Sequence, residues 1–404
     1  MSPAVVVWML ALLLGIQPVS TDLYLPALPS LPRDLGASVS AAQLTLSALI
    51  ICFGLAQPVC GPLADRFGRR PVLLNGLALY TVASVLAALS PTIGWLIVWR
   101  GLQGAAMAAA VTCGRSMVRD LFEPHEGARV MSKALGGLGT IALLCPLIGG
   151  VIMQWFSWHA ALMALAIFGA ALLGFVAWRF EETALQLNPA ATQLGPLWRN
   201  WKQIARHPTF VAYTLLLMST YGGLFIMLAA SSFVFIDVLG LSRLGYGAVL
   251  ATNCVAYILG TLLCRRLLAR RGLRATVALG GALSLSGGVL LAVLSLAGAH
   301  EVTFWAVIAP QWLYALGHGI HQPCGQAGAV GPFRDKAGTA ASLSGFCMMF
   351  TAFLIGLWLG RSLNGTVFPL TLGIAAFSVA VATVAWTLVQ RHGDPQPSAA
   401  AQPA

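Results

Sequence analysis

Stretches of about 20 mostly apolar residues recur along the whole of this 404-residue chain, and they constrain its fold more than any other feature. As an α-helix, a stretch of that length crosses the hydrocarbon core of a bilayer. Only 9% of the residues are charged, against about a quarter in soluble domains, so the chain lacks the polar surface that a globule in water needs. The sequence therefore predicts an all-α polytopic membrane protein and excludes soluble enzymes and disordered proteins.

Twelve such stretches are predicted as transmembrane helices. They are residues 5–28, 42–63, 72–90, 94–118, 131–154, 158–179, 209–236, 244–265, 275–297, 303–325, 340–360 and 367–389. The first lacks the basic flank and cleavage site of a signal peptide. A longer polar stretch follows the sixth. The predicted organisation is an N-terminal six-helix bundle at 1–180, a cytoplasmic central linker at 181–208, a C-terminal six-helix bundle at 209–390 and a disordered tail at 391–404.

Lysine and arginine positions set the predicted orientation. With the N-terminus inside, 18 of the 23 basic residues fall on the inner side, three on the outer side and two within the fourth span. This asymmetry predicts cytoplasmic N- and C-termini in a bacterial-type inner (plasma) membrane. The net charge of +11 thus reflects topology, and no nucleic-acid partner is expected. The inner groups include Arg265, Arg266, Arg270, Arg271 and Arg274 after span eight, and Arg334 and Lys336 after span ten.

Motifs of ATP-driven transport and of enzymes are missing from the sequence. No lysine lies in a phosphate-binding glycine loop, and no nucleophile elbow or HExxH motif occurs. The eight cysteines form no CxxC pair, and no metal site is predicted. We therefore expect no catalytic residues and no cofactor, with transport driven by an ion gradient or by the gradient of the substrate itself.

The predicted inner loop between spans two and three is the most informative segment. Residues 61–71 read GPLADRFGRRP and place one acid and three arginines in a tight turn. Asp65 can cap or bridge a helix end, and the arginines can meet carboxylates or helix C-termini. The alternative is that the arginines only anchor the membrane surface. The predicted conformational-switch residues are Gly61, Asp65, Arg66, Gly68, Arg69 and Arg70.

This G-x-L-A-D-R-x-G-R-R pattern resembles the signature loop of the major facilitator superfamily (MFS). Residues 100–104, RGLQG, match the R-x-x-Q-G element of its 12-span drug:proton antiporters, and residues 145–150, CPLIGG, resemble their antiporter element. Residues 21–29, TDLYLPALP, and 118–122, VRDLF, look like its Bcr/CflA (bicyclomycin/chloramphenicol resistance) subfamily. The resemblance implies two six-helix bundles that rock about a central cavity and export drug-like compounds against proton entry. Pro146, Gly149 and Gly150 are the residues of the antiporter-like element.

Two ionisable residues lie deep in predicted spans. Asp22 is about 25 Å from the inner boundary, counted from Val5, and Arg100 is about 9 Å from the outer end of its span. Their similar depths allow them to pair, and ionisable groups in a membrane are functional candidates by default. We predict Asp22 as the proton or cationic-substrate site and Arg100 as its coupling partner. A static ion pair, or a hydrated Asp22, is the alternative.

Further candidates lie along spans four and ten. Arg115 is on nearly the same helix face as Arg100, about 22 Å further in, and is either a substrate contact or a snorkelling anchor. His318, His321 and Gln322 share one face of span ten, where they form either a proton relay or a polar packing patch. Cys324 lies on another face, which disfavours a metal site. The remaining cavity candidates, which core packing also explains, are Tyr24, Gln103, Met218, Tyr221, Phe225, Asn253 and Tyr257.

These features favour a proton-coupled exporter of drug-like, hydrophobic or cationic small molecules that acts by alternating access as a monomer. Its expected partners are the small-molecule substrate, protons and the lipid bilayer. One alternative is an MFS importer or facilitator of a small metabolite. Another is a polytopic membrane enzyme acting on lipid, which would need clustered acids or a nucleophile with a base. A membrane sensor or receptor is a third.

Overall fold

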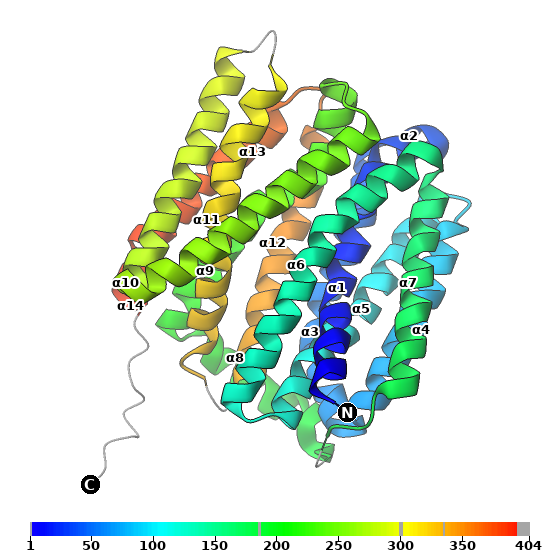
Figure 1. Cartoon of the computed structure of the whole chain (residues 1–404), viewed down its shortest axis with the longest axis vertical. Helices are drawn as coiled ribbons and strands as arrows, with labels where there is room; N and C mark the ends of the chain where they lie inside the picture. The colour runs from blue at the N-terminus through cyan, green and yellow to red at the C-terminus, as the bar shows by residue number, and fades with distance from the viewer. Residues whose placement is uncertain (1, 185–186, 299–301, 334–335, 394–404) are drawn as a thin grey trace. The chain divides into compact units, whose positions relative to one another are not determined.

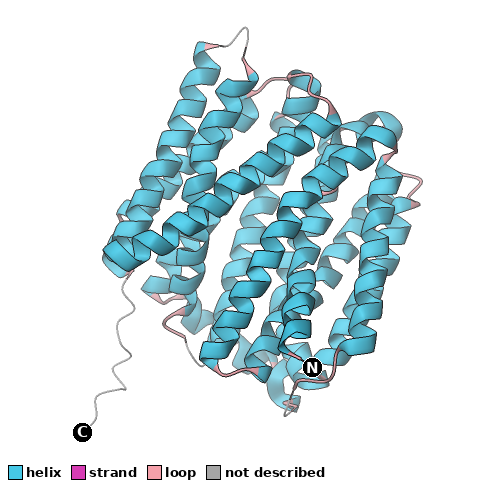
Figure 2. Ribbon diagram, viewed as in Figure 1, coloured by secondary structure: helices cyan, strands magenta, loops and turns pink. Residues whose placement is uncertain are grey.

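The computed structural model describes residues 2–184, 187–298, 302–333 and 336–393. Within these ranges every regular element is a helix, and no strand occurs (Figures 1 and 2). Ten described segments are long and apolar enough to cross a membrane. Helices satisfy their own backbone hydrogen bonds, which an apolar span in lipid requires. The chain is therefore an all-α, multi-pass membrane protein, as predicted. Arg334 and residues 394–404 of the predicted tail lie outside the described residues.

Two compact units make up the chain, and each is discontinuous in sequence. Unit 1 comprises Met1–Leu194, Phe235–Ala251 and Gly356–Leu363, and unit 2 comprises Gly195–Val234, Thr252–Ile355 and Asn364–Ala404. The halves predicted from the sequence are continuous, and their boundaries stay a prediction.

Unit 1 is held together by packing among the first seven α-helices of the chain. In it, α5 packs against α3 and α4, α4 packs against α7, and α1 packs against α5 and α6. The α-helical part of the first predicted span ends early, at Asp22, because Pro26 and Pro29 lack the N–H groups that would continue it. The elements are α1 (Pro3–Asp22), the 3₁₀ helix η1 (Leu25–Ser30), α2 (Leu31–Asp34), α3 (Val39–Phe67), α4 (Arg69–Ala88), α5 (Ile93–Leu121), α6 (Pro124–Trp155) and α7 (Trp158–Arg179).

The predicted linker contains helices of its own. A 3₁₀ turn, η2 (Pro189–Thr192), precedes α8 (Leu194–Ala205). In α8 the side chain of Trp198 is exposed, whereas that of Ile204 is buried in the core of unit 2. One face of α8 is therefore anchored to unit 2 by apolar packing.

Unit 2 has a core of apolar side chains in which α9 packs against α11 and α13. Buried residues of this core include Tyr213, Cys264 and Ile320. The Tyr213 hydroxyl donates a 2.9 Å hydrogen bond to the carbonyl oxygen of Gly393, so the last described residue is tied to the core. The helices from residue 208 onward are α9 (Pro208–Ser232), the π-helical turn η3 (Phe233–Val238), α10 (Arg243–Ala297), α11 (Phe304–Val330), α12 (Ala337–Ser362), α13 (Phe368–Trp386) and α14 (Leu388–His392). Of these, most of η3, the start of α10 and the end of α12 belong to unit 1.

Helix α10 runs for 55 residues through a corner at Gly272. Gly272 has φ of 74°, a left-handed value that favours glycine, and the backbone on both sides is helical. The two arms, 243–271 and 273–297, cover the predicted spans at 244–265 and 275–297. Each arm is long enough to cross a bilayer.

Candidate functional site

Asp22 is the last residue of α1, where the helix stops being α-helical. The Thr21 hydroxyl donates a 2.7 Å hydrogen bond to Asp22 Oδ1. Thr21 and Leu23 are buried, whereas Asp22 is only half-buried. The carboxylate thus combines one protein donor with access from outside the protein packing, as a group that exchanges protons or binds cations requires.

Arg100 is completely buried within α5 and has several partners in unit 1. Its Nη2 donates a 2.8 Å hydrogen bond to the Ser20 carbonyl oxygen, and its Nη1 donates to Gln103 Oε1. The guanidinium carbon also lies 4.3 Å from the centre of the Tyr24 ring, which is cation–π geometry.

Asp22 and Arg100 do not form the ion pair that their similar depths in the predicted spans allowed. Among the described residues, ion pairs join Arg33 to Asp34, and Arg69 to Asp65 and Asp120. The Arg100 guanidinium instead contacts the Ser20 carbonyl oxygen, the Gln103 side-chain amide and the face of the Tyr24 ring. The two residues still share one neighbourhood, since Ser20 and Tyr24 flank Asp22 in the chain.

Buried hydroxyl groups extend this neighbourhood into a network across four helical segments of unit 1. Gln103 Nε2 donates to Ser84 Oγ of α4 at 2.6 Å, and the Tyr24 hydroxyl lies 2.9 Å from Thr45 Oγ1 of α3. The Ser20 and Tyr80 hydroxyls are 2.7 Å apart. Sequence reasoning missed Ser20, Thr45, Tyr80 and Ser84, whose one signal is that polar groups inside apolar spans must pair with each other.

The antiporter-like element of α6 packs directly beside this site. A Cβ at Gly149 would overlap the backbone of Leu23, the residue after Asp22. A Cβ at Gly150 would lie 2.7 Å from the carbonyl oxygen of Arg243, at the start of α10. The two glycines therefore allow α6 to approach two backbones at once. Pro146 faces the same turn of α10, because a Cβ at Gly247 would meet its carbonyl oxygen.

Arg115, the other arginine within a span, is exposed on α5 and is not joined to this network. No hydrogen bond or ion pair within the described residues holds its side chain. The structure therefore separates Arg115 from Arg100, and both readings of Arg115 stay open.

The predicted switch loop forms an ion-pair cluster centred on Arg69. Arg69 is buried; its Nη1 lies 2.6 Å from Asp65 Oδ1, and its Nε donates to Asp120 Oδ2 at 3.1 Å. Thr183 Oγ1 also donates to Asp120, at 3.3 Å. Asp65, in the last turn of α3, therefore bridges to the start of α4, one of the two roles predicted for it, and the cluster links the α3–α4 corner to the end of α5.

Glu182, which follows α7, performs the helix-capping role predicted for Asp65. Its carboxylate accepts hydrogen bonds from the backbone N–H groups of Arg69 and Arg70, at 2.8 and 3.0 Å, at the start of α4. It also accepts two 3.0 Å bonds from the N–H groups of Thr183 and Ala184. Partial burial would raise the pKa of Glu182, but these four donors outweigh it and hold the pKa below its ordinary value.

Gly68 makes this capping contact possible. It is the single non-helical residue between α3 and α4, with φ of 98°. A Cβ there would also collide with the Glu182 carboxylate.

The other predicted switch residues have separate surroundings. Arg66 Nη1 donates to Thr192 Oγ1 at 2.7 Å, and Arg70 Nη2 donates to the Ala177 carbonyl oxygen at 3.1 Å. The Cβ position of Gly61, by contrast, has ordinary space around it.

In unit 2, His318 of α11 is the centre of a smaller polar site. It is buried, and its Nδ1 lies 2.9 Å from the Thr220 hydroxyl of α9. Its ring faces that of Tyr257 from α10, with centroids 5.5 Å apart. Asn253, one turn before Tyr257, is buried, and its Oδ1 has no hydrogen-bond partner. The predicted residues Asn253, Tyr257 and His318 thus belong to one region.

The polar face predicted on α11 does not form one continuous patch. His321 is fully buried, and its Nε2 lies 3.1 Å from the Val277 carbonyl oxygen, on the second arm of α10. Gln322 is half-buried, and its Oε1 has no hydrogen-bond partner. His318 and His321 lie on the same face of α11, but a helix face is wide enough for residues three apart to contact different neighbouring helices. The two histidines therefore have different partners.

The cavity candidates on α9 differ in exposure. Phe225 and Tyr221 are buried, whereas Met218 is half-buried. Phe225 therefore fits the packing alternative.

Comparison with known proteins supports the resemblance in the motifs. The family described as the Major Facilitator Superfamily matches residues 10–354. A "Chloramphenicol resistance protein" of Pseudomonas aeruginosa is 30% identical over 329 residues, 81% of this chain and 76% of that protein. A "Bicyclomycin resistance protein homolog" of Haemophilus influenzae is 24% identical over 95% of this chain and 96% of that protein. These relatives confirm the predicted Bcr/CflA resemblance.

Among solved structures, a D-xylose-proton symporter has the same fold, with a TM-score of 0.74 at 15% identity. The match covers 96% of this chain and 98% of that one. The family match over most of the sequence, together with this all-helical fold, shows that the chain belongs to the major facilitator superfamily.

Proposed function

We propose that this protein exports drug-like, hydrophobic or cationic small molecules across the inner membrane in exchange for protons. The observation that carries the proposal is the half-buried Asp22 carboxylate beside the buried Arg100 network. Two relatives are named for chloramphenicol and bicyclomycin resistance, which supports the substrate class. In this proposal the protein is a transporter rather than an enzyme, and it acts as a monomer without a cofactor.

Proton exchange at Asp22 would follow from its changing surroundings. A carboxylate with one hydroxyl donor and no ion-pair partner gains or loses its proton as its solvation changes. A cationic or polar substrate competes with the proton for the same oxygens. Alternating access would then couple substrate release to proton uptake on the outer side.

The proposal includes twelve spans with both termini in the cytoplasm. The two arms of α10 count as two spans, and α11 is long enough to be another at 27 residues. The excess of arginine and lysine in the predicted inner loops supports this orientation.

The test uses purified protein in liposomes with an acidic lumen and a lumenal pH dye. A panel of compounds that includes chloramphenicol and bicyclomycin is added to wild type, to Asp22→Asn and to Asp34→Asn. Asp34 is the matched control, because its carboxylate pairs with the exposed Arg33 outside the site. We expect compound-induced proton efflux in wild type and Asp34→Asn, and its loss in Asp22→Asn.

Two other results would change the proposal. Accumulation of compounds without proton movement would make the protein a facilitator. Full proton coupling in Asp22→Asn would remove Asp22 from the coupling step.

A further inference from the structure

The corner of α10 carries a dense group of arginines, which we call the corner arginines: Arg265, Arg266, Arg270, Arg271 and Arg274. Four of them are exposed, and Arg274 is half-buried. No hydrogen bond or ion pair within the described residues engages the four exposed side chains. Their positive charges are therefore free for a partner.

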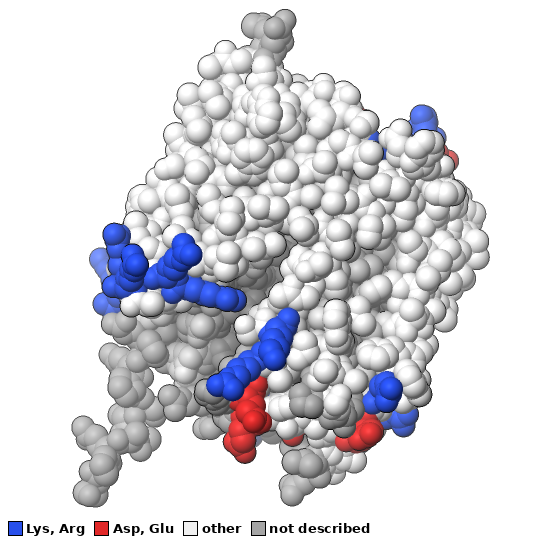
Figure 3. Space-filling model, in the orientation of Figure 1, with Lys and Arg blue, Asp and Glu red and all other residues white. Residues whose placement is uncertain are grey.

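The described part of unit 2 offers these arginines no acidic residue. Its described residues include no Asp or Glu, although they include ten lysines and arginines. In Figure 3, basic side chains gather near the place where Figure 1 labels α10, with no acidic side chain among them. The surroundings of the corner thus favour an anion that comes from outside the chain.

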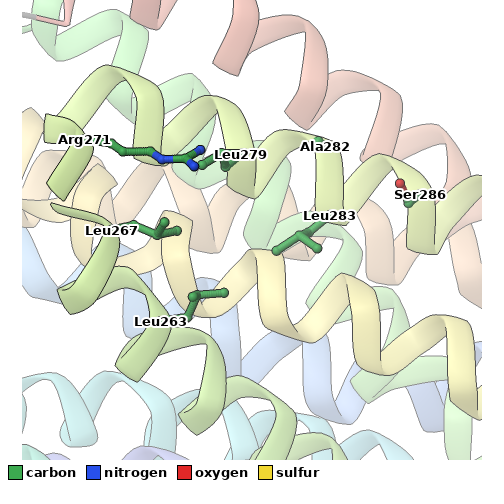
Figure 4. A pocket seen from close by; sticks show the side chains of 7 residues that line it. All are labelled: Leu263, Leu267, Arg271, Leu279, Ala282, Leu283 and Ser286. Carbon is green, nitrogen blue, oxygen red and sulfur yellow. The ribbon is translucent and has the colours of Figure 1, made fainter.

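A groove lies between the two arms of α10, next to the corner. It has a volume of about 350 Å³, and five of its seven lining residues are aliphatic. Figure 4 shows Arg271 at one end of this lining and Ser286 at the other, with the leucines between them. The lining residues are Leu263, Leu267, Arg271, Leu279, Ala282, Leu283 and Ser286.

The groove is on a helix that faces lipid. Leu262 on the first arm and Val289 and Leu290 on the second are 40–47% exposed, and α10 has the length and hydropathy of a membrane-crossing helix. Such side chains are stable when lipid covers them. A lipid chain can therefore enter the groove from the side without crossing water.

We propose that this groove binds an anionic phospholipid, with one acyl chain along the leucines and its phosphate at Arg271. Basic pockets between transmembrane helices on the cytoplasmic side favour such head groups. An uncharged lipid would leave the arginine unpaired, and the ammonium of a zwitterionic lipid would find no carboxylate in the described part of unit 2. A free phosphate would leave the apolar lining unused.

The experiment measures lipid binding to the full-length, delipidated protein by native mass spectrometry in detergent. The probes are long-chain phosphatidylglycerol, long-chain phosphatidylcholine, dihexanoyl phosphatidylglycerol and inorganic phosphate. The variants are Arg271→Gln and its matched control Arg270→Gln, which removes the same charge from an exposed neighbour outside the groove lining. Gel filtration checks that each variant is folded.

We expect long-chain phosphatidylglycerol to bind more tightly than phosphatidylcholine, and Arg271→Gln to weaken it about fivefold. Arg270→Gln should bind it nearly as wild type does. Equal losses in both variants would mean general attraction to a basic surface and would overturn the site. Equal binding of the two long-chain lipids, equal binding of dihexanoyl phosphatidylglycerol or full competition by inorganic phosphate would overturn it too.

A second pair of variants tests the acyl-chain position. Leu283→Trp fills the groove, whereas Val289→Trp places the same indole side chain on the exposed face of the same arm. Only Leu283→Trp should reduce phosphatidylglycerol binding. If neither variant does, the chain does not occupy the groove.

Discussion

A buried guanidinium carries five N–H donors and a charge, and removing both from water is costly unless partners are in place. Around Arg100 the partners are a backbone carbonyl, an amide and an aromatic face, rather than a carboxylate. The charge is thus held without neutralising Asp22. This leaves the only acid of the site available for the substrate or the proton.

The contacts of Arg100 predict that a positive charge at position 100 is not enough for normal transport. Lysine keeps the charge but lacks the planar fork that reaches Ser20 and Gln103 together. We expect Arg100→Lys to lower compound-driven proton flux by about tenfold or more, because the end of α1 loses its support. Arg33→Lys is the control, because Arg33 is exposed and pairs with Asp34 outside the site, and flux through it should remain close to wild type. Normal flux through Arg100→Lys would show that the fork is not needed.

Glu182 shows how an acidic side chain can substitute for a capping residue that a helix lacks. We expect Glu182→Gln to lower the stability of the folded protein by about 1 kcal/mol at neutral pH, the usual contribution of a helix cap. Glu123→Gln is the control, because Glu123 precedes α6 without a side-chain capping bond. Thermal unfolding in detergent measures both variants against wild type.

The pKa of Glu182 gives this prediction a definite pH dependence. Because its pKa is lower in the folded chain, its contribution is fully present above the ordinary value of 4.5 and is lost as the pH falls through the folded value. The gap in melting temperature between wild type and Glu182→Gln should therefore close as the pH falls below 4.5. A gap that stayed constant at low pH would exclude a charged cap.

At the scale of elements, the contact between α6 and the end of α1 links the antiporter-like motif to Asp22. We expect Gly149→Ala to push Leu23 away and to reduce compound-driven proton flux, at a cost in stability of about 1–3 kcal/mol. Gly136→Ala in the same helix is the matched control, since no atom lies within 4 Å of its Cβ position. Flux and melting temperature together distinguish the two variants. Equal behaviour would mean that α6 tolerates the methyl group.

Most helices could be predicted because the apolar stretches are long and recur along the chain, but the residues at which the helices end could not be predicted. The sequence predicts a break of several residues between spans eight and nine, whereas α10 turns at Gly272 alone. The linker was predicted without helices, although apolar residues at helical spacing, such as Trp198, Trp201 and Ile204, mark α8. The arginine-rich sequence at 265–274 indicates a polar break, yet its residues continue the helices on either side of the single glycine.

Only part of the site could be predicted from the sequence. Asp22 and Arg100 stand out because charge is rare in a span, and their depths follow from counting residues. The hydroxyl groups of Ser20, Thr45, Tyr80 and Ser84 do not stand out, because such a side chain in a span looks the same in the sequence whether it only packs or also forms a hydrogen bond. The capping role of Glu182 depends on contacts between segments more than 100 residues apart.

At the scale of the whole molecule, the distribution of arginines predicts a topology that fusions can test. A fluorescent protein fused after the last residue should fold and fluoresce, because the C-terminus is predicted to be cytoplasmic. Alkaline phosphatase inserted after Gly36, beside the outer residue Arg33, should be active, since that enzyme requires export. The reverse pair of results would invert the proposed orientation.

The glycine corner of α10 also has a consequence for digestion of the native protein. Trypsin cuts after arginine, but it needs several residues of extended chain, and such segments are usually loop tips. Around Gly272 the arginines are exposed, yet the backbone is helical up to the glycine and again after it. The richest tryptic sequence in the molecule should therefore resist cleavage until α10 unwinds, and the appearance of a cut there would report the loss of that helix.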